Sequence, residues 1–406
     1  MYKKSEPLMK ILFINDPALA FDPNGERLMN EITVKMDKRW EIHSIHSGAR
    51  KYENLSCIHK THVISLLAHL DLIIPKIMYI LFSIYVGVKL IKKHKINVVM
   101  TLGGHVHLGL AAYLVARITR RKCIVRVSSD VGSEIVFFLQ RVNVPVLSSK
   151  ISLRIVRDVA KKLEMFLFKH MDCSITHSPM DYEKIKQMLG RVTFIPLWVD
   201  AEKFSPLSDN LKSQLKKELF GNVNSKIVFF VGRLHPEKDV ATLIHAFGEV
   251  IEELENVILA IVGIGPEEDK LRKMSNDLNI QKRVKFLGFI THDHLPKYYN
   301  ASDVYVLPSL REAWSNTIME AMASGVPVIA TNTPANPYLI KNGKTGFLVP
   351  PQDPSALAEK ISYVLKHPKR VIDIISNARC EIKKYEKDYI GELYKNSILE
   401  IVNEQN

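Results

Sequence analysis

Two glutamates in the second half of the chain, Glu312 and Glu320, have the spacing and surroundings of a ligand-binding pair. An apolar run, Val304 to Leu307, leads into a polar loop and then into a stretch of helical character, so Glu312 falls in the loop and Glu320 two turns along. Backbone N–H groups at a helix start bind anions, and carboxylates accept hydrogen bonds from hydroxyl groups. A ligand with phosphate and sugar hydroxyls fits this pattern. Such pairs also occur on solvated helices, so the neighbouring motifs are needed to distinguish a ligand-binding site from an ordinary helix surface.

Two cations follow the first strand expected in the same half, Ile227 to Val231. Arg233 comes after a glycine turn and Lys238 lies five residues further on, so together they could neutralise a diphosphate. A second glycine turn, at Gly263, would let a phosphate or sugar approach the backbone, and a third, just before Phe289, could carry a flat base. The alternatives are an ordinary basic loop and tight structural turns.

Short apolar runs alternate with amphipathic stretches in both halves, which predicts an α/β protein with doubly wound parallel sheets. In the first half the expected strands are Ile11 to Asn15, Glu41 to Ile45, Val98 to Leu102, Cys123 to Ser128, Cys173 to His177 and Thr193 to Ile195, with a helix at Gly109 to Thr119. In the second half they are Ile227 to Val231, Val257 to Val262, Val284 to Leu287, Val304 to Leu307, Pro327 to Ala330 and Gly346 to Val349, with helices at Val240 to Leu254 and Pro266 to Leu278.

The length of 406 residues fits two domains. A proline-bounded segment without clear periodicity, Pro196 to Pro206, places the link near residue 205. We therefore expect Rossmann-like domains at 1–205 and 206–382 that face a cleft, and a helix over 383–406 that returns to the first domain. Ligands of such sheets bind at the carboxyl ends of the strands.

The composition indicates which class of partner the protein binds and in which compartment it is found. The net charge of +13 favours an anionic partner, such as a nucleotide, a phospholipid surface or a nucleic acid, but no basic stripe with interleaved aromatic residues supports nucleic acid. The four cysteines have no paired spacing, and the start of the chain lacks the pattern of a signal peptide, so we expect a cytoplasmic protein.

One apolar segment, Leu72 to Val88, raises the question of membrane contact. It is at the short limit for a membrane span and contains Pro75 and Lys76. Lysines follow it up to Lys95, so the segment could lie in an anionic membrane interface, at the inner face of the cell membrane. A long buried helix with a solvated basic end is the alternative.

The order of the motifs resembles the retaining glycosyltransferases of family 4, which have the two-domain GT-B fold. The likeness covers nearly the whole second half and rests on Gly232-Arg-Leu-His-Pro-Glu-Lys238, Gly263-Ile-Gly-Pro266, Leu287-Gly288, Leu307-Pro-Ser309, Glu312 with Glu320-Ala-Met-Ala-Ser-Gly-Val-Pro327, and Asn342-Gly-Lys-Thr-Gly-Phe-Leu-Val-Pro350.

The resemblance implies a role for each donor-site residue. Arg233 and Lys238 would hold the donor diphosphate, Glu312 the transferred sugar and Glu320 the ribose. Backbone amides from Trp314 through Ser315 to Asn316 would meet sugar and phosphate, Gly263 would allow their close approach, and the base would lie near Phe289. Arg233, Lys238 and the helix dipole can stabilise the departing diphosphate without a metal ion, so neither metal nor cofactor is expected. His292 and His294 are expected to be helix-cap and surface residues.

The first half departs from the family pattern. Ser129-Asp130 stands where many relatives have a histidine, and Asp130 could orient the acceptor or simply form a turn or cap. Near the donor site, Ala313 replaces a usual glycine and Tyr338 a common glutamate. The sequence thus predicts an enzyme, a retaining glycosyltransferase that moves a sugar from a nucleotide-diphosphate donor, with UDP slightly favoured, to a glycan or lipid-linked acceptor in cell-surface polysaccharide or glycolipid synthesis. The alternative is a non-catalytic GT-B protein that binds nucleotide or an anionic membrane surface.

Overall fold

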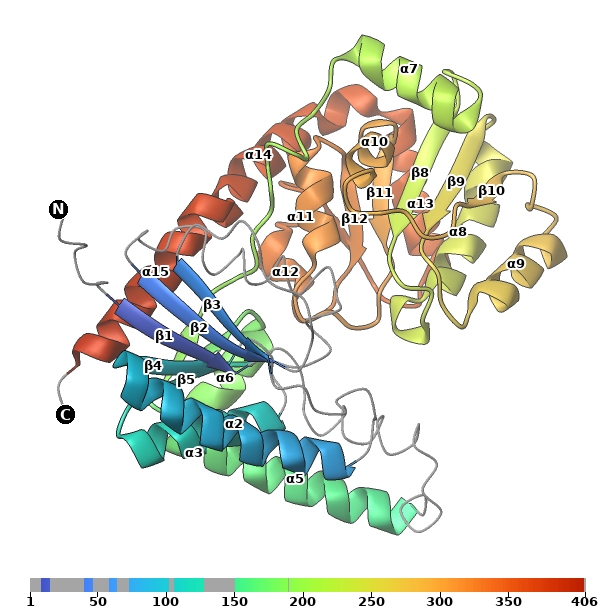
Figure 1. Cartoon of the computed structure of the whole chain (residues 1–406). Helices are drawn as coiled ribbons and strands as arrows, with labels where there is room; N and C mark the ends of the chain where they lie inside the picture. The colour runs from blue at the N-terminus through green and yellow to red at the C-terminus, as the bar shows by residue number, and fades with distance from the viewer. Residues whose placement is uncertain are drawn as a thin grey trace, which may run out of the picture. The chain divides into compact units, whose positions relative to one another are not determined.

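The computed structural model describes residues 9–14, 40–46, 58–63, 73–101, 106–127, 150–188 and 190–404. The chain divides into two compact units (Figure 1). Unit 1 comprises residues 1–196 and 387–406, and unit 2 comprises residues 197–386.

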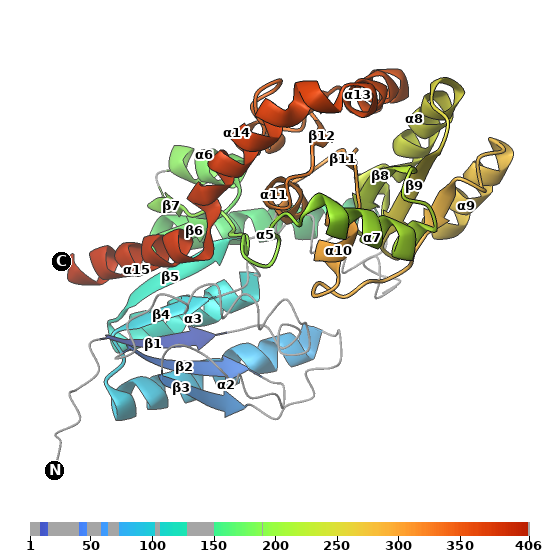
Figure 2. The same cartoon turned by 90° about the horizontal axis from the view of Figure 1, so that it is seen from above.

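Unit 1 is built on a parallel sheet of seven strands in the order β3-β2-β1-β4-β5-β6-β7. The strands are β1 (Met9–Ile14), β2 (Trp40–His46), β3 (Ile58–Val63), β4 (Val98–Thr101), β5 (Lys122–Val127), β6 (Cys173–Thr176) and β7 (Val192–Phe194). Its helices are α2 (Ile73–His94), α3 (Val106–Thr119), α5 (Lys150–His170), α6 (Pro179–Gln187) and α15 (Lys387–Asn403). Helices α2 and α3 lie side by side against the sheet (Figures 1 and 2). The central strands are mostly apolar because both faces of the sheet are buried, although Lys10 and Arg126 also lie in them.

Unit 2 holds a parallel sheet of six strands in the order β10-β9-β8-β11-β12-β13. The strands are β8 (Lys226–Val231), β9 (Val257–Val262), β10 (Val284–Phe286), β11 (Val304–Leu307), β12 (Val328–Thr331) and β13 (Phe347–Val349). Its helices are α7 (Asp209–Phe220), α8 (Val240–Glu253), α9 (Glu268–Asp277), α10 (Leu295–Asn300), α11 (Asn316–Ala323), α12 (Asn336–Leu339), α13 (Pro354–Lys366) and α14 (Ile372–Ile382). The first strand of this unit, β8, has β9 on one side and β11 on the other, so the strand order reverses there. That reversal is where doubly wound sheets bind ligands.

The expected strands are confirmed, with bounds that differ by no more than two residues. The expected helix at Gly109 begins earlier, at Val106. Strand β3 was not expected from the sequence. It pairs with β2 alone at the edge of the sheet, and its mixed sequence, Ile58-His-Lys-Thr-His-Val63, lacks the apolar run of a strand buried on both faces.

The division between the units falls after Pro196, earlier than the expected link near residue 205. The reason is that the following segment packs into unit 2: Phe204 is fully buried, with its ring centroid 5.7 Å from that of Tyr299. The returning helix begins at Lys387 rather than at residue 383, because Tyr385 is still tied to unit 2 by the Val199 N–H, which donates to its carbonyl at 2.8 Å.

The apolar segment up to Val88, for which both membrane contact and a long buried helix were considered, lies in α2. Ser83, Gly87 and Leu90 face the core, while Leu81 and Tyr85 are 57% and 66% exposed. The helix is therefore neither wholly buried nor wholly solvated. Across the part of the chain that the structure covers, no helix combines the length and hydropathy needed to span a membrane.

Candidate functional site

The carboxyl ends of the unit 2 strands bring the sequence-predicted donor residues to one edge of the sheet. Phe289 follows β10, Gly263 follows β9, Arg233 follows β8 and Glu312 follows β11, so the residues line up in the order of the strands. Phe289 is 70% exposed, as a surface for a base would be. Two of the glycine turns at this edge are hydrogen-bonded to each other, since the Gly263 N–H donates to the carbonyl of Gly288 at 2.8 Å.

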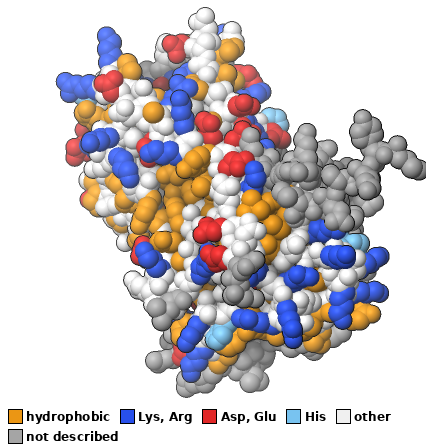
Figure 3. All heavy atoms as spheres, turned by 90° about the vertical axis from the view of Figure 1, so that its left-hand side faces the viewer, with side chains coloured by type: hydrophobic (Ala, Val, Ile, Leu, Met, Phe, Trp, Pro, Cys, Tyr) orange, Lys and Arg blue, Asp and Glu red, His pale blue; other side chains and the backbone are white. Residues whose placement is uncertain are grey.

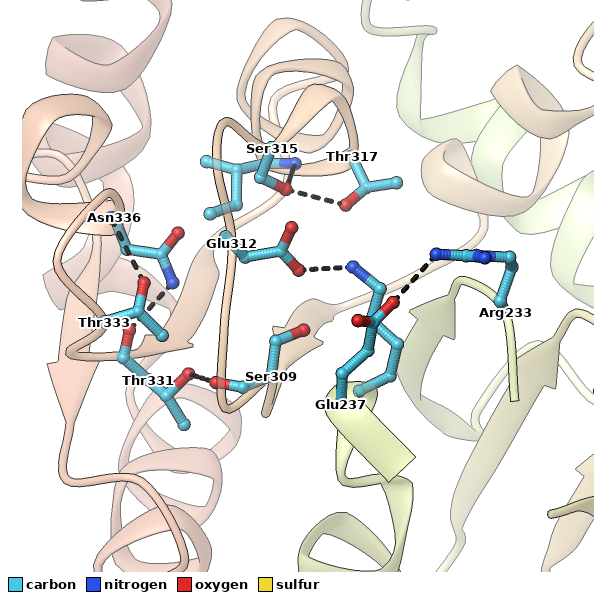
Figure 4. Close-up of polar contacts among 11 residues, drawn as sticks. Arg233, Glu237, Ser309, Glu312, Ser315, Thr317, Thr331, Thr333 and Asn336 are labelled. Carbon is cyan, nitrogen blue, oxygen red and sulfur yellow. Dashed lines mark hydrogen bonds and ion pairs between the residues drawn. The ribbon is translucent and has the colours of Figure 1, made fainter. Parts of the chain in front are cut away.

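Glu312 and Lys238 form a close ion pair at this edge, with 2.6 Å between the carboxylate Oε1 and the ammonium Nζ. Their side chains are 8% and 17% exposed, so the pair is largely removed from water. Arg233 is different, because its side chain is 76% exposed and pairs with Glu237 at 2.8 Å (Figure 4). An ammonium has three N–H donors, so Lys238 can keep Glu312 and still donate to a phosphate oxygen.

The loop that carries Glu312 is fixed at both ends (Figure 4). The Thr331 hydroxyl donates to the carbonyl of Ser309, and the Leu310 N–H donates to the carbonyl of Glu237 at 2.8 Å. At the far end Ser315 caps α11 by accepting the N–H of Ile318. These bonds fix the position of Glu312 relative to the start of α11.

The two residues on either side of the Ser315 cap have different environments. Trp314 is buried, with its ring centroid 5.5 Å from that of Tyr385, so only its backbone is suited to contact a donor. Asn316 is the first helical residue, and its side-chain Oδ1 is buried without a hydrogen-bond partner. That oxygen is a further acceptor next to the helix start, which the sequence pattern did not distinguish from the backbone.

Glu320 is 2% exposed and both of its carboxylate oxygens accept hydrogen bonds. Tyr299 donates its hydroxyl to Oε2 at 3.0 Å, and the Nε2 of His292 lies 2.9 Å from Oε1. The other ring nitrogen of His292, Nδ1, lies 3.1 Å from Lys203 Nζ, which can only donate. We therefore assign the ring proton to Nε2, which donates it to Glu320.

This network corrects the expected role of His292. It was expected as a cap or surface residue, but it contacts the glutamate expected to bind ribose. His294 does occupy the cap position of α10, although its side chain makes no capping bond. The sequence could not predict the contact between His292 and Glu320, because the two residues are 28 positions apart and only the fold brings them together.

Unit 1 presents a buried pair of basic side chains at the carboxyl ends of β5 and β6. Arg126 is 5% exposed and His177, directly after β6, is 8% exposed. Burial, and then the charge of Arg126, lowers the pKa of His177 to about 3. Asp130 lies outside the described residues, so its expected role in orienting the acceptor stays a prediction.

The low pKa of His177 makes unit 1 sensitive to acid. The unfolded chain binds a proton near pH 6.5 and the folded chain only near pH 3, so stability is lost as the pH falls through this window. Between pH 7 and pH 5 this residue should cost about 2 kcal/mol of unfolding free energy. Urea unfolding at both pH values should show this loss in the wild type and its absence in His177→Gln. Equal losses in the two proteins would contradict the prediction.

The fold and the relatives together give the class of the protein. Its two doubly wound units have the GT-B fold, as does the structure of Anabaena HepE in complex with UDP, which is 20% identical, covers 97% of this chain and 100% of that chain, and gives a TM-score of 0.74. The family model described as glycosyl transferases group 1 matches residues 212–381.

Curated relatives agree with the family model. The UDP-Gal:alpha-D-GlcNAc-diphosphoundecaprenol alpha-1,3-galactosyltransferase of Escherichia coli is 32% identical over 282 residues, which cover 68% of this chain and 67% of the relative. The D-inositol 3-phosphate glycosyltransferase of Corynebacterium glutamicum is 30% identical over 218 residues, which cover 51% of this chain and 52% of that one. The chain spans about half the length of several such relatives. The chain belongs to the glycosyl transferases of group 1.

Proposed function

We propose that the protein is a retaining glycosyltransferase that moves a sugar from a nucleotide-diphosphate donor to a glycan or lipid-linked acceptor. The observation that carries the proposal is the cluster at the reversal point of the unit 2 sheet, where the Lys238–Glu312 pair lies between the Arg233 loop and the start of α11. The cluster offers cations for a diphosphate and carboxylates for hydroxyl groups within one edge of one sheet.

The chemistry follows from where charge develops. As the bond from the anomeric carbon to the diphosphate breaks, negative charge builds on the leaving phosphate. Arg233, Lys238 and the N–H groups at the start of α11 can stabilise that charge by hydrogen bonding, without a metal ion. Glu312 would accept hydroxyl protons of the transferred sugar and Glu320 those of the ribose. Retention of configuration is part of the proposal through the resemblance to family 4.

The donor test is a thermal-shift screen with UDP-, GDP- and ADP-sugars in the absence of metal, since a ligand that binds only the native state raises its stability. We expect UDP-sugars to give the shift, because HepE is seen with UDP and the Escherichia coli relative is named for UDP-Gal. Glu320→Ala should abolish the shift. If no nucleotide sugar raises the midpoint, the non-catalytic alternative is favoured.

His292 should set the affinity for the ribose through Glu320. His292→Ala removes one of the two donors that orient the carboxylate, so UDP binding should weaken by about tenfold. His292→Gln, which can still donate to Glu320, should recover most of the affinity. Calorimetric titration with UDP and with its 2′,3′-dideoxy analogue measures the effect, and the analogue should bind both variants and the wild type with similar weakness. A loss of affinity that is equal for UDP and the analogue would place His292 outside the ribose contact.

We also propose peripheral contact with an anionic membrane, through α2 and α5. On α2 the exposed apolar residues Leu81 and Tyr85 continue, at helical spacing, into exposed Lys89 and Lys92. On α5 exposed Val159, Met165 and Phe166 alternate with exposed lysines. Figure 3 shows one face of the molecule, on which basic side chains outweigh acidic ones in the lower part of the view. Apolar anchors beside lysines are typical of interfacial helices.

Vesicle sedimentation tests the membrane contact. The wild type should bind vesicles that contain phosphatidylglycerol and leave neutral phosphatidylcholine vesicles unbound, because lysines attract anionic lipid. The double change Leu81→Ser/Tyr85→Ser should lower binding by about tenfold. Ile372→Ser is the matched control, since Ile372 is equally exposed, at 58%, but belongs to unit 2. Equal binding by both variants would remove α2 from the contact.

A further inference from the structure

One carboxylate and two imidazoles meet in unit 1, in a place that the proposed transfer reaction does not use. Glu41 and His43 are two residues apart in β2, so their side chains point to the same face of the sheet. They are 6% and 0% exposed. His94, the last residue of α2, joins them, and one potential ligand atom from each residue lies within 4.8 Å of the other two.

The geometry is close to that of a transition-metal site. Oε1 of Glu41 and Nε2 of His43 are 3.1 Å apart, near the roughly 3.3 Å edge of a tetrahedron of oxygen and nitrogen ligands around Zn²⁺. The ring centroids of His43 and His94 are 4.5 Å apart. His94 is only partly buried, so a modest rotation of its side chain can bring its nitrogen into the same tetrahedron. Two imidazoles and one carboxylate form a recognised zinc donor set, with a fourth position for water.

A positive charge, the ammonium of Lys10, lies beside the cluster. Lys10 Nζ lies 3.5 Å from Oε2 of Glu41, whereas Oε1 faces His43. In the metal-free chain the lysine balances the carboxylate, and a proton occupies the hydrogen bond between Glu41 and His43. A metal ion bound at Nε2 takes the place of that proton, which moves to the other ring nitrogen of His43 or to solvent. The lysine side chain is 23% exposed, so its ammonium can move toward water when the ion enters.

We propose that Glu41, His43 and His94 bind one divalent transition-metal ion of the Zn²⁺ type. The ion would join the end of α2 to β2, two elements that are distant in the sequence, and it would stabilise the folded chain because the three ligands come together only there.

The test uses the full chain, freed of any affinity tag and stripped with a chelator. Zn²⁺ alone is titrated by calorimetry, and Co²⁺ is added separately because tetrahedral Co²⁺ gives intense visible absorption. The wild type should bind about one Zn²⁺ per chain, and the ion should raise the thermal midpoint by a few degrees. His94→Ala and Glu41→Gln should each weaken binding by about 100-fold. The control is His170→Ala, a histidine of the same unit at the end of α5.

Each possible outcome either supports the proposed metal site or overturns it. Binding that is lost in both cluster variants and kept in the control supports it. Absence of Zn²⁺ binding by the wild type overturns it, and this measurement needs no variant to fold. Binding that His94→Ala retains at full strength also overturns it, since the three groups are then only a hydrogen-bonded cluster. None of these readouts involves a nucleotide sugar, so the result is independent of the proposed reaction.

Discussion

Lys238→Ala should lower sugar transfer by about 10²- to 10³-fold, because in the proposed reaction it removes a cation from the place where the leaving diphosphate gains charge. It should also destabilise unit 2 by about 3 kcal/mol, since the Glu312 carboxylate, only 8% exposed, then lacks the cation 2.6 Å away. The two effects have separate measurements: initial rates and donor titrations for the first, and urea unfolding for the second.

A double variant separates the functional effect from the structural one. Lys238→Met with Glu312→Gln replaces the buried ion pair by neutral groups of similar size, so most of the lost stability should return. Donor binding and transfer should stay low, because neither the cation nor the carboxylate is restored. Lys270→Ala is the surface control, since Lys270 is 66% exposed in its pair with Glu267 and should change neither quantity much. Recovery of transfer in the double variant would refute the assigned roles of both residues.

Gly263→Ala should be the most destabilising small substitution at the candidate donor site. Gly263 has φ +138°, a conformation that residues with a side chain rarely adopt, and an added Cβ would lie 1.8 Å from the carbonyl oxygen of Gly232. Both the strain and the clash with backbone must be relieved by moving the turns after β8 and β9 apart. We expect the unfolding free energy to fall by more than about 3 kcal/mol, with loss of the donor-induced thermal shift.

Gly248→Ala gives a matched control in the same unit. Gly248 lies inside α8, and an added Cβ there meets no atom within 4 Å. Alanine is the better helix former, so this change should raise the unfolding free energy by about 0.5–1 kcal/mol. Urea unfolding of both variants makes the comparison. Similar stabilities for the two would contradict the close approach at Gly263.

The α/β class, the two parallel sheets and nearly every strand could be predicted from the amino-acid sequence. These features depend on local patterns: strands buried on both faces are continuous apolar runs, as at β8 and β9, and glycine turns mark their ends. The candidate donor residues could be found for the same reason. Arg233, Gly263 and Glu312 lie in loops that follow strands, and the carboxyl ends of parallel strands share an edge, so the sequence predicted that these residues would lie at one edge, while their roles came from the family resemblance.

The contacts between side chains, by contrast, could be known only from the folded structure. The Lys238–Glu312 pair joins residues 74 positions apart, and the bonds from Tyr299 and His292 to Glu320 cross between separate elements. No periodicity records such contacts, because they depend on how the strands are ordered and how loops close over them. The edge strand β3 and the cluster of Glu41, His43 and His94 could not be predicted from the sequence for the same reason. A short polar segment or a single histidine becomes informative only when its neighbours in space are known.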